Sequence, residues 1–165
     1  MTVRGYKMKV TNVDRLGRRK GPVRWVDVPA ATRCPNGFAE IEGFVSRVLA
    51  SKAPSCWAIF STKSGNTSIS VGSLNGAVTL GLSADARSQA QQKAIRAFFA
   101  RRDIAPSQDY LAGNGGRPNA TRILSFPMPR DAKAISELAT DLLRAVYRLK
   151  ETTTLDMRFE EHEAI

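Results

Sequence analysis

The segment DAKAISELATDLLRAVYRLK, residues 131–150, carries the clearest structural pattern in this 165-residue sequence. Its apolar residues recur at the spacing of an amphipathic helix, and most of its charged residues fall on the opposite side. Asp131 can accept hydrogen bonds from the unpaired amides of the first turn, and Arg144 lies near the end where the helix dipole favours cations. We therefore predict a helix over 131–150 that buries one face. The buried stripe comprises Ile135, Leu138, Leu142, Val146 and Leu149.

Three short segments upstream of this helix predict an antiparallel meander. They are CWAIFS (56–61), TSISVGS (67–73) and AVTLGL (77–82). The second segment alternates apolar residues with serine, which is typical of a strand with one buried and one wet face. Asn75-Gly76 joins the second and third segments and is a strong hairpin signal, because both central residues of a type I′ turn need a positive φ.

Two further helices are predicted on either side of the meander. The first runs over 38–50 with Asn36 as its N-cap, and the second runs from Ser83 or Asp85 to about Arg102. Both carry apolar residues at helical spacing, so each is expected to pack one side on the sheet.

The remaining segments are predicted as strands or connections. Residues 29–37 contain two prolines and a glycine and are predicted to be a connector. Strands over 109–112 and 121–126 precede the last helix. Residues 155–159 alternate apolar with charged side chains after that helix, which leaves two alternatives, an added edge strand or a tail that docks on a partner.

This order of elements predicts an α+β fold. Strands and helices do not alternate strictly, so an antiparallel sheet with three helices packed on it fits better than a parallel wind. We expect an α+β core domain over 36–150, a basic hairpin or arm over 1–30, and an acidic C-terminal tail over 151–165.

Composition is that of a soluble single domain, with 42% apolar and 24% charged residues. No apolar run reaches the ~20 residues that span a bilayer, and the N-terminal residues have no apolar signal region. The two cysteines form no CxxC motif and suit a reducing compartment. We therefore expect a cytoplasmic protein without a membrane span.

The charge distribution indicates an acidic partner. The net charge is +10, with eight basic and two acidic residues in 1–30 but one basic and five acidic residues in 151–165. Such a field attracts nucleic acid, anionic membrane or acidic protein, and it also keeps a protein soluble.

Residues 3–10 and 22–28 predict a hairpin whose connection is basic. This basic connection indicates either a phosphate-binding arm or a solvated, partly disordered leader, and the sequence leaves both alternatives open. The candidate contacts to a partner or to phosphate are Arg15, Arg18, Arg19, Lys20, Arg24, Arg101, Arg102 and Arg117.

No catalytic, metal or cofactor site is predicted. The one histidine, His162, lies in the acidic tail. Cys34, Cys56 and His162 are far apart in the sequence, so they predict neither a zinc site nor a catalytic group. Residues 113–117 form a glycine cluster that lacks the lysine and serine or threonine of a phosphate-binding loop, so a flexible loop is the preferred interpretation. We expect that the protein is not an enzyme.

The core over 36–150 resembles the type III secretion chaperone-like fold, including its peptide-binding chaperone relatives. The likeness rests on the meander described above and on the closing segment PMPRDAKAISELATDLLRAVYRL, residues 127–149, in which a proline-broken strand leads into a long helix. It is a likeness of architecture over about two-thirds of the chain. It implies a non-enzymatic binder, often a dimer, that holds extended segments of partner proteins.

Three functional hypotheses follow. The first is an adaptor or chaperone-like protein that captures a partner with an acidic or extended segment through its sheet face or edge. The second is an accessory protein that binds DNA or RNA, whose affinity would fall steeply with salt. The third is an enzyme with unrecognised loop residues. Self-association as a homodimer is compatible with each.

Overall fold

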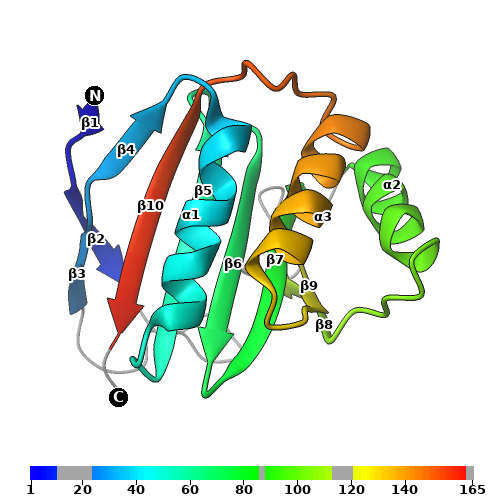
Figure 1. Cartoon of the computed structure of the whole chain (residues 1–165), viewed down its shortest axis with the longest axis horizontal. Coiled ribbons are helices and arrows are strands. Elements are labelled where there is room, and N and C mark those ends of the chain that lie inside the picture. The colour runs from blue at the N-terminus through cyan, green and yellow to red at the C-terminus, as the bar shows by residue number, and fades with distance from the viewer. Residues whose placement is uncertain (11–23, 86–87, 113–120, 163–165) are drawn as a thin grey trace.

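The computed structural model describes residues 1–10, 24–85, 88–112 and 121–162 and confirms the α+β class. Within these residues, three helices lie on one face of an eight-stranded antiparallel sheet (Figure 1). The helices are α1 (Gly37–Ala50), α2 (Gln89–Ala100) and α3 (Ala132–Ala145). In spatial order the strands are β1 (Thr2–Val3), β4 (Ala31–Cys34), β10 (Leu155–His162), β5 (Ser55–Thr62), β6 (Ser68–Leu74), β7 (Ala77–Asp85), β9 (Thr121–Pro127) and β8 (Gln108–Ala112).

The predicted meander is confirmed as β5, β6 and β7. Asn75 and Gly76 have φ angles of 50° and 86°, the two positive values that the predicted turn requires. Phe60, Ile69 and Leu82 stand opposite one another across the three strands and are almost fully buried beneath the helices. The alternate residues of these strands point to the other face of the sheet.

Helix α3 begins as predicted, since the side chain of Asp131 accepts a hydrogen bond from the amide of Ala134 at 3.0 Å. It ends at Ala145, however, and not at Lys150. Arg148 adopts a left-handed conformation with φ 56°, which turns the chain out of the helix.

The starts of the other two helices differ in part from the prediction. Helix α1 begins directly after Asn36, although the Asn36 side chain makes no capping hydrogen bond. Strand β7 extends to Asp85, so the predicted caps Ser83 and Asp85 are wrong. Both belong to the strand, and Ser88 precedes α2 instead.

The segment 29–37 contains β4, a strand that the connector prediction missed. Strand β10 is neither an edge strand nor a free tail, because it lies between β4 and β5. Leu155 and Met157 of β10 are buried at 1% and 0% exposure. The guanidinium of Arg33 on β4 donates to the Asp156 carboxylate at 2.8 Å. These contacts place the C-terminal segment inside the core sheet.

Strands β2 (Tyr6–Val10) and β3 (Arg24–Val28) confirm the N-terminal hairpin and form a separate two-stranded sheet. Its predicted basic tip, residues 11–23, lies outside the described residues. Among the described helices, none is long and apolar enough to cross a membrane.

The core lies between the helices and one face of the sheet. The rings of Phe99 in α2 and Phe126 in β9 stack with centroids 3.6 Å apart. All three helices lie on this side (Figure 1), and no described helix covers the opposite face. We call that uncovered side the open face.

Candidate functional site

The structure tests only part of the predicted set of cations. Arg24 begins β3, whereas Arg101 and Arg102 follow the last residue of α2. The hairpin and α2 lie at opposite ends of the main sheet (Figure 1), so these cations are not brought together. The other predicted residues lie outside the described part of the chain: Arg15, Arg18, Arg19, Lys20 and Arg117.

Arg102 has contacts within the fold. Its guanidinium lies 3.7 Å from the centroid of the Phe98 ring and donates to the Phe98 carbonyl at 2.9 Å. It also lies 3.9 Å from Asp141 of α3. Arg102 therefore helps to join α2 to α3, and its predicted role toward a partner stays a prediction.

The centre of the open face is made of small, uncharged residues. Ser70 on β6 stands opposite Gly81 on β7, Gly81 stands opposite Ser125 on β9, and Ser125 stands opposite Gln108 on β8. The Ser70 hydroxyl donates to the Gly81 carbonyl at 3.5 Å. Because none of these side chains is bulky, they rise little above the strands, and the surface of the sheet is recessed here. We call this part of the sheet the shallow region.

Trp57 of β5 bounds this shallow region on one side. A Cβ atom at Gly72, the residue opposite it on β6, would lie 2.0 Å from the indole carbons Cε3 and Cζ3. The indole therefore lies directly against the Gly72 backbone, in space that any side chain would fill. The indole N–H donates to the Ser55 hydroxyl at 3.1 Å, which fixes the ring and satisfies its polar group.

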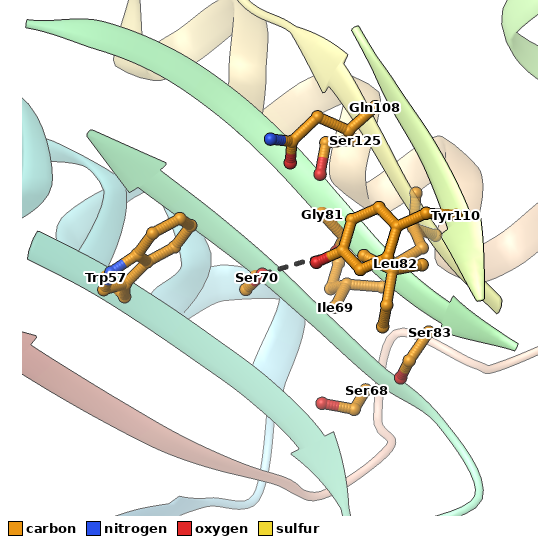
Figure 2. A pocket seen from close by; sticks show the side chains of 11 residues that line it. Trp57, Ser68, Ile69, Ser70, Gly81, Leu82, Ser83, Gln108, Tyr110 and Ser125 are labelled. Atoms are coloured by element: carbon orange, nitrogen blue, oxygen red, sulfur yellow. Dashed lines mark hydrogen bonds between the residues drawn. The ribbon is translucent and has the colours of Figure 1, made fainter. Parts of the chain in front are cut away.

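Tyr110 of β8 bounds the same region on the other side. Figure 2 shows its ring reaching from β8 toward Gly81, with the phenol end directed toward Ser70. Between the two aromatic rings lies a hollow of about 200 Å³. Its polar lining consists of Ser68, Ser70, Ser83, Gln108 and Ser125 besides the tyrosine hydroxyl.

Sequence reasoning missed this hollow because it counted Trp57 only as part of an apolar strand. Trp57 follows Cys56 and precedes Ala58, which both point to the core, so alternation alone places it outward. Gly72 and Gly81 supplied a second signal. A glycine inside a strand often marks a place where another group approaches the backbone closely.

Strand β8 forms one end of the sheet and pairs, within the described chain, only with β9. The strand at the other end, β1, has two residues, whereas β8 has five. Tyr110 and Leu111 are 49% and 46% exposed. Strand β8 contains no lysine or proline, two residues that commonly protect a sheet edge from pairing, and its one charged residue, Asp109, is paired with Arg96 and Arg122.

An ion-pair cluster anchors β8 to its neighbours. Asp109 accepts from Arg96 of α2 and from Arg122 of β9, each at 2.5 Å. The hydrogen bond from Arg96, together with that from Arg122, outweighs desolvation and lowers the pKa of the Asp109 carboxyl. With Lys93, the two arginines line a groove between α2 and β9, so the helix-covered side of β8 is positively charged.

The described residues show no arrangement typical of metal binding, since no three His, Cys, Asp or Glu side chains gather in them. Cys34 and Cys56 are buried and unpaired. His162 ends β10, where its Nε2 lies 3.5 Å from the Glu160 carboxylate.

Comparison of the chain with protein-family models, with curated proteins and with solved structures found no match in any of the three. The resemblance to type III secretion chaperones stays a prediction that rests on the order of α1, the meander, α2, the β8–β9 pair and α3.

Proposed function

We propose that this chain is a non-catalytic binding protein that captures an extended segment of a partner protein by pairing it with β8. The exposed, five-residue edge of β8 is the observation that supports this function most directly. A strand that joins such an edge gains backbone hydrogen bonds, and its alternate side chains are recognised on the two faces of the sheet.

The charge of the protein favours a partner segment with acidic residues. On the helix-covered side, an added strand would lie beside Leu111 and near the groove lined by Lys93, Arg96 and Arg122. The net charge of +10 would speed association with such a partner. In this proposal the predicted basic arm contributes further contacts, and the location is cytoplasmic, which the unpaired buried thiols support.

The test is selection from a displayed library of short random peptides, followed by binding measurements on two matched variants. Leu111→Lys places a charge on the β8 edge. Leu74→Lys makes the same change at a leucine that is 55% exposed in β6, away from that edge. We expect the selected peptides to bind the wild type and Leu74→Lys equally and Leu111→Lys at least tenfold more weakly, about 1.4 kcal/mol. Equal binding to both variants would contradict capture at β8.

A second copy of the chain is the competing occupant of β8, in agreement with the homodimer expectation. Sedimentation equilibrium distinguishes the two: a dimer that Leu111→Lys dissociates and Leu74→Lys preserves would assign the edge to self-association. A monomer that binds the selected peptides would assign it to a partner.

A second candidate function, an accessory protein that binds nucleic acid, is favoured by the net charge of +10 together with two aromatic rings on the open face. It predicts that affinity for DNA or RNA falls linearly on a log–log plot against salt, because bound phosphates release counterions. A flat salt response would exclude this candidate.

A further inference from the structure

We propose that the open face holds bases of a single-stranded nucleic acid, stacked on Trp57 and Tyr110. This inference builds on the second candidate function, and it does not depend on strand capture, which uses the backbone edge of β8. It goes beyond that candidate by naming the site, the form of nucleic acid and the kind of contact.

The Trp57 ring is held in a fixed position. One side of the indole rests on Gly72, and its N–H is satisfied by Ser55. The ring is partly exposed and already held in place, so a ligand that stacks on it loses little side-chain freedom. Base–aromatic stacking needs only such a flat, accessible surface.

Two aromatic rings face one hollow from opposite sides. Tyr110 is 49% exposed, and its ring lies across Ser70 from Trp57 (Figure 2). Gly81 contributes no side chain to the floor between them. Two aromatic surfaces on a single sheet face can hold successive bases of one strand, since unstacked bases are splayed out when proteins bind single strands.

The floor of the hollow is polar and uncharged. The hydroxyl and amide groups of Ser68, Ser83, Ser125 and Gln108 both donate and accept hydrogen bonds. Among the described residues, no charged side chain lines the hollow. A neutral, planar base edge suits this lining, whereas a carboxylate or an ammonium group would lose its hydration without a partner of opposite charge.

The charge of the whole chain favours an anionic ligand. A neutral base can enter the hollow only if the phosphates beside it are accommodated, and the net charge of +10 favours a polyanion. Two carboxylates of β10 stand on the open face: Asp156, which is paired with Arg33 at 2.8 Å, and Glu160, which lies opposite Trp57. The ion pair reduces the repulsion of a phosphate by Asp156, whereas Glu160 favours a path for the phosphates on the β6 side of Trp57. A duplex does not fit this site, because pairing and stacking cover its bases and the hollow of about 200 Å³ accepts only isolated rings.

The test is fluorescence anisotropy with labelled short oligo(dT) and oligo(rU), with a random-sequence duplex as competitor. We expect Trp57→Ala and Tyr110→Ala each to weaken single-strand binding about tenfold or more. Tyr110→Phe, which keeps the ring, is expected to bind nearly as well as the wild type. Leu74→Ala removes an exposed apolar side chain away from the hollow and serves as the matched control.

A further variant tests whether binding depends on the position of the Trp57 ring and not only on the presence of an indole. Gly72→Val would occupy the space beneath Trp57 and displace the ring, so it should weaken binding although every aromatic residue is kept. Circular dichroism and thermal melting of each variant must show the wild-type fold for its affinity to count.

The outcomes distinguish the site from the broader function. Binding that is steep in salt but unchanged in the ring variants would overturn the stacking site and leave the nucleic-acid candidate in place. A duplex that competes as well as a single strand would also overturn the site. Absence of binding at low salt would overturn both, and strand capture at β8 would be unaffected.

Discussion

Tyr147 has the most strongly shifted pKa that the structure resolves. It follows α3, its hydroxyl is buried, and among the described atoms that hydroxyl has no hydrogen-bond partner. Burial raises its pKa from 10.0 to about 12, because the phenolate would lose its hydration. The folded state therefore favours the neutral phenol.

Folding stability should consequently decrease in alkaline solution. Below pH 10 both the folded and the unfolded chain carry the neutral phenol, so the raised pKa does not change the free energy of unfolding. Between pH 10 and about 12 the unfolded chain ionises first, and up to about 2–3 kcal/mol of stability is lost. Urea unfolding across this range measures the loss. Tyr147→Phe removes the titrating group, and an equally steep loss in that variant would contradict the assignment.

Single residues with a local role were the most predictable from the sequence. Asp131 caps α3, and Asn75 with Gly76 forms the predicted turn, because each role depends on neighbours within a few residues. Trp57 and Gly72 could not be assigned in this way. Their contact depends on the register of β5 with β6, which residue types alone leave undetermined.

The end of α3 is an element boundary that residue types alone did not predict. The helical pattern continues to Leu149, yet the helix stops at Ala145. Arg148 adopts the left-handed conformation with φ 56°, which turns the chain away from the helix axis. The Leu149 amide then donates to the Leu143 carbonyl at 3.0 Å. Glycine or asparagine usually marks such a stop, and an arginine carries no such signal.

Replacing this arginine by glycine should stabilise the protein. Arg148→Gly relieves the cost of a left-handed conformation, which is about 1 kcal/mol for a residue with a Cβ. Part of this gain is offset by the greater freedom of glycine in the unfolded chain. We expect a small rise in the free energy of unfolding, measured by urea titration, whereas the control Arg148→Ala keeps the Cβ and should show no rise. A gain in the alanine variant equal to that in the glycine variant would contradict this account.

The contact of α2 with β8 and β9 depends on Asp109. Because hydrogen bonds from Arg96 and Arg122 lower its pKa, this carboxylate contributes stability above the pKa of the unfolded chain. That contribution is lost as the pH falls through the folded pKa.

Asp109→Asn should therefore destabilise the protein at neutral pH by about 1 kcal/mol or less, since the cluster is partly exposed. The difference between the variant and the wild type should shrink in acid, where the wild-type carboxyl is protonated as well. Thermal melting at neutral and acidic pH measures both effects, and a difference that is independent of pH would contradict the ion-pair role.

The two proposed surfaces belong to the scale of the whole molecule, because each needs strands that are distant in sequence. The hollow combines β5, β6, β7, β9 and β8, and its polar floor exists only after they pair in this order. The β8 edge exists because the sheet ends there. Sequence reasoning found the fold class and most of the strands. It missed β4, and it could not order the strands, since that order depends on long-range pairing.

Strand β10 is where the whole-molecule arrangement departs most from the sequence interpretation. It fills the gap between β4 and β5 and buries Leu155 and Met157. Loss of those two side chains alone would cost about 2–5 kcal/mol each, which is comparable with the total stability of about 5–15 kcal/mol of a typical domain. It would also leave β4 and β5 with unpaired edges, which favours aggregation.

A chain that stops after Thr154 should therefore fail to fold cooperatively, whereas the full sequence should melt in one cooperative transition. Differential scanning calorimetry and light scattering measure the two outcomes. A synthetic peptide of residues 155–162, added in trans to the shorter chain, should restore a cooperative transition, because it can occupy the same gap. A shorter chain that is monomeric and melts cooperatively without the peptide would show that the segment is a dispensable tail, as the alternation of residues 155–159 had left open.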